Sequence, residues 1–371
     1  MRTCRTLPAL LIAGVFAVHI AGAQSPDPTS SAVQMTAAAV QLLEALSPEA
    51  RQTAMFRLDD EVARTTWSNL PASFVARKGV RLGDLDAPTR ILLHRLIQAS
   101  TSSQGYAKMS GIMWLDEILH DQSLERQQRG EMPSNERMNT LIASWTSDNY
   151  WFSFFGDPAV DANWAWLLSG HHLSANFTVA EGKVAFTPLF LGAEPYEVAS
   201  GPMAGWRVLS HEVERGYEMV QSLDAAQRRK AILSDEVPRD IVEGPGGRGD
   251  IKAFEGLPAS ELNANQQLLL WHLVREYVAN ADFDAADAQM KKIEADGLEK
   301  LYFTWIGPSD DIAKRYYYRV HGPSILIEYM RERGVGEGAA NHIHTIVRDP
   351  NNDYGEDWLK VHYREQHGEG R

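Results

Sequence analysis

Apolar residues recur every three to four positions through the first third of the chain, which is the spacing of one face of an α-helix. This pattern predicts a helix over residues 32–46. Ser47 and Asp86 are each followed within two residues by a proline, and a capping side chain before an early proline is typical of a helix N-terminus. We therefore expect two more helices to begin there, and another over residues 105–120.

The pattern changes near residue 150, where apolar residues become continuous or alternate with polar ones. An aromatic run over residues 150–155 predicts a strand, closed by Gly156. Residues 173–179 alternate between apolar and polar side chains, which is typical of a half-buried strand. A turn at Glu181-Gly182-Lys183 is expected to join this strand to a partner over residues 184–189.

The second half of the chain contains both the helical spacing and the strand-like runs of apolar residues. Three helices are predicted, with a glycine-rich loop at residues 243–250 between the second and the third: 208–221, 224–233 and 260–279. Short apolar runs then recur in a pattern that predicts an antiparallel meander before a closing helix at residues 356–365: 301–306, 316–321, 325–329 and 342–348. No repeat period is visible along the sequence.

These elements predict an α+β fold, with a helical N-terminal third followed by an antiparallel sheet with packed helices. A length of 371 residues is compatible with one large or two modest domains. We expect one domain over residues 31–371, with its helical part at residues 31–125 and its sheet-containing part at residues 150–371.

The N-terminus has the pattern of a cleavable signal peptide. Arg2 and Arg5 precede an apolar stretch over residues 7–22, and Ala21-Gly22-Ala23 supplies the small residues of a cleavage site. The alternative is a buried N-terminal helix. We expect a signal peptide at residues 1–23, a linker at residues 24–30 and a periplasmic or secreted protein. No later run is apolar for about 18 residues, so no membrane association is expected after cleavage.

Composition narrows the function classes. The formal net charge of −13 disfavours nucleic acid as a partner, since phosphate would be repelled. The expected partner is a small-molecule substrate. The single cysteine, Cys4, lies in the predicted signal peptide, which excludes a disulfide scaffold and a cysteine-based metal site. His211-Glu212 begins like a zinc-protease helix, but Arg215 stands where the second histidine is needed.

Two histidine clusters are candidates for chemistry. His171-His172 opens the alternating strand, and His342-Ile343-His344 places two imidazoles on one face of a predicted strand. In an exported chain without thiols, imidazole and carboxylate are the strong ligands that remain, and they suit a divalent transition metal such as Zn, Cu or Fe. Glu328 lies inside an apolar run, and a buried acid needs a partner such as an arginine or a metal.

Several strings together resemble the bacterial and fungal family named domain of unknown function 3500: Tyr150-Trp151-Phe152-Ser153-Phe154-Phe155-Gly156, Gly170-His171-His172, Tyr317-Tyr318-Arg319, Ile327-Glu328-Tyr329, Asn341-His342-Ile343-His344 and Asn352-Asp353-Tyr354-Gly355. The resemblance spans residues 37–363 and implies one domain, often exported, with the histidine strings as family features. Met330 departs from the family pattern, in which an aspartate is expected after Ile-Glu-Tyr. If that acid belongs to the site, Glu332 is its expected substitute here.

Our leading hypothesis is an exported metal-dependent enzyme, hydrolytic or oxidative. Its metal ligands would be His172, His342 and His344, with Glu328 as a fourth ligand or general base. The remaining candidates orient the imidazoles or stabilise anionic charge: His171, Asp349, Arg319 and Arg348.

Two alternatives stay open at this point. One is a metal-free acid/base enzyme, in which Glu328, Arg319 and Arg348 act with a histidine on an anionic substrate. The other is a non-catalytic exported binding protein whose histidines only order the sheet. The alternatives differ in whether His172, Glu328 and the 342/344 pair converge within the coordination distance of one ion.

Overall fold

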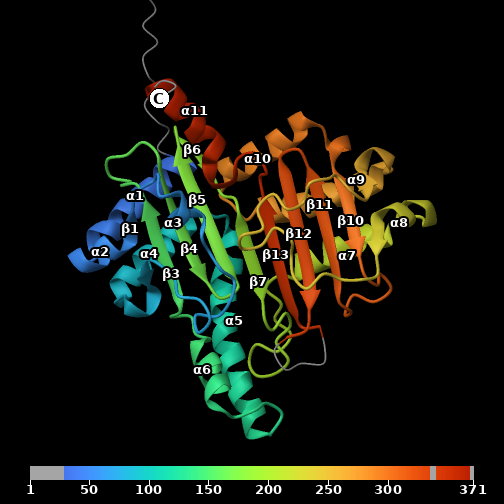
Figure 1. Cartoon of the computed structure of the whole chain (residues 1–371), viewed down its shortest axis with the longest axis horizontal. Coiled ribbons are helices and arrows are strands. Elements are labelled where there is room, and N and C mark those ends of the chain that lie inside the picture. Colours follow the sequence, from blue (N-terminus) through green and yellow to red (C-terminus); the bar gives the residue numbers. More distant parts are fainter. Residues whose placement is uncertain (1–28, 335–339, 368–371) are drawn as a thin grey trace, which may run out of the picture.

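The computed structural model describes residues 29–334 and 340–367, and it contains a mixed sheet of thirteen strands flanked by helices (Figure 1). The predicted signal peptide and most of the predicted linker lie outside the described residues. The main path of the sheet runs in the order β1-β3-β4-β5-β7-β13-β12-β11-β10-β8. The α+β class is therefore confirmed, while the division into signal peptide, linker and one domain stays a prediction.

The strands divide into two sides of the sheet, with seven in the first and six in the second. The first side contains β1 (Met55–Phe56), β2 (Val80–Arg81), β3 (Tyr150–Phe155), β4 (Trp164–Gly170), β5 (Leu173–Ala180), β6 (Lys183–Ala185) and β7 (Leu189–Ala193). The second side contains β8 (Ile232–Ser234), β9 (Leu257–Pro258), β10 (Tyr302–Ile306), β11 (Tyr316–Gly322), β12 (Ile325–Glu332) and β13 (His342–Arg348). Pairing is antiparallel except between β1 and β3 and between β8 and β10.

Helices precede and separate these strands. Those of the first part are α1 (Ser31–Ala45), α2 (Pro48–Ala54), α3 (Glu61–Thr65), α4 (Ala87–Ser100), α5 (Ser103–Gln128) and α6 (Glu136–Ser144). Those of the second part are α7 (Ser210–Gln221), α8 (Ala225–Ala231), α9 (Ala264–Val278), α10 (Phe283–Asp296) and α11 (Glu356–His367). Ser47 and Asp86 cap α2 and α4 as predicted, because each side chain accepts a backbone N–H of the first turn.

The two sides of the sheet repeat one order of elements. Both contain, in order, two helices, a short strand, a long connection, a second short strand, a 3-10 turn, two long helices and four main strands; the first side has α3, α6 and β6 in addition, and the second side has a further 3-10 turn. The first short strand pairs parallel, and the second antiparallel, with the first main strand: β1 and β2 with β3, and β8 and β9 with β10. We call residues 31–193 the first half and residues 210–348 the second half.

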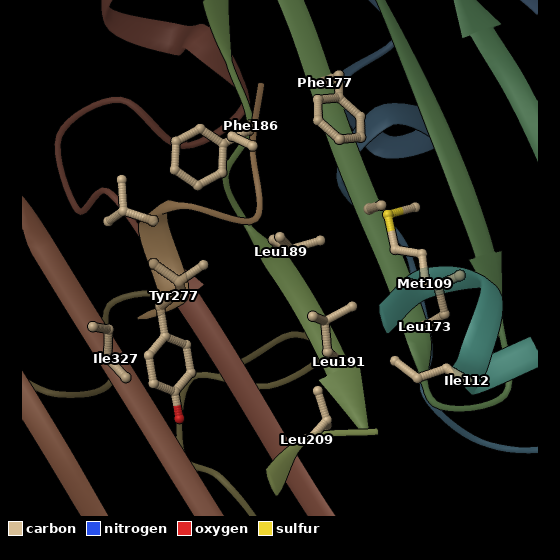
Figure 2. Close-up of a cluster of buried hydrophobic side chains, with 14 of the residues drawn as sticks. Met109, Ile112, Leu173, Phe177, Phe186, Leu189, Leu191, Leu209, Tyr277 and Ile327 are labelled. Carbon is tan, nitrogen blue, oxygen red and sulfur yellow. The ribbon is translucent and has the colours of Figure 1, made fainter. Parts of the chain in front are cut away.

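The main core lies between one face of the sheet and the helices. Figure 2 shows Leu173 of β5 beside Met109 and Ile112 of α5, and Ile327 of β12 beside Tyr277 of α9, with Leu191 of β7 between the two groups. These side chains are fully or almost fully buried. Because alternate residues of a strand point to opposite faces, this apolar layer leaves the intervening residues on the other face.

The other face of the sheet carries polar and charged side chains. Ser174, Phe190, Ile346, Glu328 and Arg319 lie in one cross-strand row, since each is paired in register with the next. Two long connections cover this face and cross in front of the strands in Figure 1. They are residues 57–79, which link β1 to β2, and residues 235–256, which link β8 to β9.

Apolar side chains hold the two connections against this face of the sheet. Trp67 of the first connection and Ile241 of the second pack in one cluster with Phe190, Met330 and Ile346. The polar face is therefore buried under loops rather than under helices.

Several sequence-based predictions need correction. The predicted strand over residues 184–189 is two strands, because Thr187-Pro188 interrupts the pairing and proline lacks the N–H that a ladder requires. The predicted helix over residues 224–233 ends at Ala231, where β8 begins. The strand β4 was not predicted, since its run of buried residues shows no alternation. The predicted meander of the second half is confirmed as β10 to β13.

Among the described residues, no helix has both the length and the apolar composition needed to cross a bilayer.

Candidate metal centre

The histidines come from β13 and from the turn between β4 and β5, on either side of β7. His344 of β13 pairs in register with Gly192 of β7, and the backbone N–H of Gly192 donates to the carbonyl of His172 at 2.7 Å. His344 and His172 therefore flank Gly192 on the polar face of the sheet, at the end where β7 finishes and β13 begins. His342 lies at the first position of β13, two residues from His344 and on the same face.

The three imidazoles meet through their Nε2 atoms. The Nε2 of His342 lies 2.8 Å from that of His172 and 2.9 Å from that of His344. The rings are steeply inclined to one another, at 60° between His172 and His342 and 88° between His342 and His344. Each ring thus directs one nitrogen toward a shared point, which is the arrangement by which imidazoles hold a single cation.

Glycine at position 192 leaves room for this convergence. A Cβ atom there would lie 3.0 Å from Cδ2 of His172 and 3.1 Å from Cδ2 of His344. Both distances are below ordinary van der Waals contact, so a side chain would push the two rings apart. The absence of a side chain at Gly192 is a steric condition for the histidine cluster.

His172 occupies a tight turn rather than the start of a strand. It has φ of 59°, which is the left-handed region that a non-glycine residue rarely adopts. The turn consists of His171 and His172, because Gly170 of β4 pairs with Leu173 of β5. The expectation that this pair opens the alternating strand is therefore wrong. The strained backbone conformation re-aims His172 toward β13.

Asp240 fixes the orientation of His344. Its Oδ1 lies 2.7 Å from Nδ1 of His344, so that nitrogen carries the proton and Nε2 is left with its lone pair. Burial acts to lower the pKa of His344, but the charge and hydrogen bond of Asp240 outweigh it and raise the pKa overall. A carboxylate behind a ligating imidazole is a recurrent feature of metal sites.

Burial has the opposite net effect on the other two imidazoles. It is the largest cause that holds the pKa of His172 well below its usual range, and neighbouring histidines add to it. Burial likewise lowers the pKa of His342, followed by the influence of His344 and His171. Both rings therefore favour the neutral form, which is the form that binds a metal.

Two further carboxylates lie beside the cluster. The Oε1 of Glu332 is 3.4 Å from Nδ1 of His342 and 3.5 Å from Nδ1 of His344. The Oε2 of Glu194 is 3.9 Å from Nδ1 of His342. The sequence analysis named Glu332 as the expected substitute for the acid that the family pattern suggests at position 330. Glu332 does lie beside two of the histidines. Met330 itself is buried in the apolar cluster beneath the loops.

His171 supports the cluster from the other side. Its ring lies over that of His172, with centroids 3.7 Å apart, and its Nδ1 is 2.6 Å from Oδ1 of Asp116 on α5. The hydroxyl of Tyr150 donates to the second oxygen of Asp116 at 2.8 Å. All three side chains are buried. The predicted role of His171, to orient the neighbouring imidazole, is consistent with this packing.

The structure does not bring Glu328 to the histidines. Its two carboxylate oxygens accept the backbone N–H groups of Val242 and Glu243 at 2.8 and 2.7 Å, and Tyr317 donates its hydroxyl at 2.7 Å. Burial raises the pKa of Glu328, and these three donors partly offset that effect. Glu328 therefore anchors the connection of residues 235–256, which carries Asp240.

The predicted charged residues Arg348, Arg319 and Asp349 also lie elsewhere. Arg348 donates to the carbonyl of Glu243 at 2.8 Å and pairs with Asp353 at 2.6 Å. Arg319 pairs with Glu255 at 3.0 Å. Asp349 pairs with Lys292 at 2.6 Å. The two arginines hold loop segments against the polar face, and none of the three pairs includes one of the clustered histidines.

Potential ligands for a metal ion form three groups among the described residues. They are His172 with His342 and His344, Asp116 with His171 and His172, and Asp240 with Glu332 and His344. Within each group, the candidate ligand atoms lie within 4.8 Å of one another. The first group consists of three imidazoles, and the other two each share a histidine with it.

The family comparison bears out the resemblance seen in the sequence. A family model described as "Protein of unknown function (DUF3500)" matches residues 29–356, which is most of the chain. The chain belongs to the DUF3500 family. No curated protein and no solved structure matches it. The histidine cluster is thus a feature of a DUF3500 chain whose activity must be argued from its geometry.

Sequence reasoning missed Asp240 and Asp116, the carboxylates that hold His344 and His171. Asp240 lies in a loop between two short strands, and Asp116 lies on the long helix α5. An acid in either context is ordinary on a protein surface. Only the fold, which brings each of them to an imidazole more than 50 residues away in sequence, distinguishes them.

We predict that Glu328→Ala loosens the connection that carries Asp240. The change leaves the buried amide of Glu243, the partly buried amide of Val242 and the Tyr317 hydroxyl without an acceptor, which costs about 1–3 kcal/mol of unfolding free energy. Hydrogen exchange of residues 240–251 should accelerate. Tyr317→Phe is the matched control, since it removes one donor and keeps both amide contacts. If the hydrogen-exchange rate of these residues is unchanged but the activity is lost, Glu328 takes part in the reaction instead.

Proposed function

We propose that this DUF3500 protein is an exported metal-dependent enzyme that holds one divalent transition metal ion at His172, His342 and His344. The convergence of the three Nε2 atoms carries the proposal. Tetrahedral coordination with metal–nitrogen bonds of about 2.1 Å separates ligand nitrogens by about 3.4 Å. The Nε2 atom of His342 lies 2.8 and 2.9 Å from those of His172 and His344, so both separations are about 0.5–0.6 Å shorter than that spacing.

Three protein ligands favour a catalytic rather than a structural site. Structural zinc is usually enclosed by four protein ligands, whereas catalytic zinc has three and keeps one position for water or substrate. Solvent also reaches one side of the cluster, because the side chains of His342 and Asp240 are 12% and 42% exposed. A substrate therefore has an approach to the fourth position past these two residues.

Hydrolysis is the reaction class that we propose. Zinc bound by three neutral imidazoles supplies a water molecule acidic enough to act as a nucleophile near neutral pH. Within the protein, Asp240 holds the His344 ring in the required tautomer, and Asp116 with His171 packs against His172. Copper and iron also accept imidazole ligands and would support oxidative chemistry instead, so the identity of the metal separates the two reaction classes.

The contacts of the arginines weigh against the metal-free alternative. That hypothesis needs Arg319 and Arg348 to meet an anionic substrate, but both are buried and paired with acids. The binding-protein alternative needs the histidines only to order the sheet. It does not explain why three imidazoles turn their nitrogens toward one another instead of toward backbone or solvent.

Metal content tests the proposal. We expect protein purified without an affinity tag or chelator to contain about one transition metal ion per chain by inductively coupled plasma mass spectrometry. The double variant His342→Ala/His344→Ala should lose it. His272→Ala is the control, because His272 is exposed on α9, and it should retain the metal. A wild-type protein that neither contains nor takes up a stoichiometric metal would contradict the proposal, provided that circular dichroism shows it to be folded.

We predict that Asp240→Asn weakens metal binding about 10–100-fold, because the amide is a poorer acceptor for the Nδ1 proton of His344. Competition with a chromogenic chelator measures the affinity. Asp235→Asn, an exposed site on the same connection, is the matched control and should leave the affinity unchanged. Equal affinity in both variants would show that Asp240 does not support the metal ligand.

Export is tested separately. We expect the full chain, expressed in a Gram-negative host, to appear in the periplasm or medium with its mass reduced by residues 1–23. The charged, apolar and small-residue segments of the N-terminus support this expectation. Intact-mass spectrometry of each cell fraction gives the answer. Accumulation of uncleaved chain in the cytoplasm would contradict export without affecting the metal proposal.

A further inference from the structure

The turn that carries His172 is bound by the first connection, residues 57–79. The backbone N–H of His172 donates to the carbonyl of Asn69 at 3.3 Å, and the carbonyl of His172 accepts the N–H of Gly192 at 2.7 Å. Both backbone groups of this residue are therefore bonded, one to a loop and one to a strand. A left-handed conformation at a non-glycine residue persists only where its surroundings enforce it, and the Asn69 carbonyl supplies one of these two backbone contacts.

Arg77 holds the segment that contains Asn69. Its guanidinium donates to the carbonyls of the two flanking residues, that of Ser68 at 3.0 Å and that of Leu70. Within the same segment, the hydroxyl of Ser68 accepts the N–H of Leu70 at 3.2 Å. The side chain of Asn69 is buried. These contacts fix the backbone on both sides of Asn69, so its carbonyl has a defined position from which to meet the N–H of His172.

The same guanidinium also reaches the strand that leads into the turn. Arg77 donates to the carbonyl of Gly170, the last residue of β4, at 3.3 Å, and to the carbonyl of Val75 at 2.7 Å. All of its hydrogen bonds to described residues thus go to backbone carbonyls, from two segments that lie far apart in sequence. The planar guanidinium can serve several acceptors at once, because its N–H donors form a rigid fork.

The charge of Arg77 lies near the acid that supports His171. Burial lowers the pKa of Arg77, and the interactions with Tyr150 and Asp116 act against that effect. Asp116 is the carboxylate that lies 2.6 Å from Nδ1 of His171. Arg77 therefore has two properties beside the histidine turn, a fork of donors and a positive charge, and lysine retains only the second of them.

We propose that Arg77 is a positioning residue of the metal centre, whose fork of hydrogen bonds to the carbonyls around Asn69 and of Gly170 holds His172 in the conformation that directs its Nε2 toward the other two imidazoles. This inference rests on the proposed metal-dependent function. Without the fork, the backbone of His172 is free to leave the left-handed region, and its ring then moves out of line with the two on β13. Loss of groups that orient a ligating imidazole weakens metal binding.

Cobalt(II) binding to two variants tests the proposal, because the visible cobalt spectrum reports the number and arrangement of the ligands. Arg77→Met removes the fork, and Arg77→Lys keeps the charge but has one nitrogen for four carbonyls. We expect both variants to bind cobalt about tenfold more weakly than the wild-type protein, with an altered spectrum. Arg57→Met, at an exposed position of the same connection, is the control and should match the wild type.

Hydrogen exchange at the amide of His172 tests the route of the effect. Followed by nuclear magnetic resonance in the metal-free protein, it should accelerate in both Arg77 variants, because the Asn69 carbonyl loses its fixed position. Circular dichroism establishes that each variant is folded. If Arg77→Met does not fold, Arg77→Lys carries the test.

The outcomes separate this inference from the metal proposal. Wild-type cobalt affinity and spectrum in folded Arg77→Lys would overturn the role of the fork and leave the metal site standing. Weaker binding with unchanged exchange at His172 would also overturn it, because Arg77 would then act by another route. A wild-type protein that binds no cobalt would contradict the metal site as well.

Discussion

The hydrogen-bonded ladder between β7 and β13 joins the two halves of the sheet, and the geometry of the histidine cluster depends on its register. The ladder aligns Gly192 with His344, while the carbonyl of His172 binds the other edge of β7. A shift of one residue would move His342 and His344 to the apolar face, since side chains alternate along a strand. On either side of this seam, apolar residues such as Leu191 and Ile343 pack into the main core. The core thus fixes the register that the polar face uses.

The polar face of the sheet is stabilised by hydrogen bonds between buried charged side chains and the loops that cover it. A sheet face covered by helices can be apolar throughout, but loops bring unpaired backbone groups that need partners. Glu328 and Arg348 supply those partners to the amides and carbonyls of residues 242–244. Burying these two charged side chains costs free energy, and the several hydrogen bonds that each side chain makes offset that cost. These charged residues therefore position Asp240, and through it His344, without touching the cluster.

Much of the fold could be predicted from local patterns, because helix caps and strand alternation are set by neighbouring residues. Ser47, Asp86 and the meander from β10 to β13 are examples. The His342-Ile343-His344 spacing likewise placed two imidazoles on one face. Glu328 was misjudged because a buried acid in a strand has the same sequence signature whether it meets a metal or a loop. The carboxylates Asp240 and Asp116, and the repeat of the two halves, depend on long-range packing that no local pattern records.

The repeated order of elements has a consequence for how the centre is assembled. His172 belongs to the first half, and His342 and His344 belong to the second. Either half alone would end in an unpaired edge strand, β7 or β13, which is a template for joining another chain. The ladder between β7 and β13 closes both of these edges at once, so the three imidazoles meet only where the two halves are joined in one sheet.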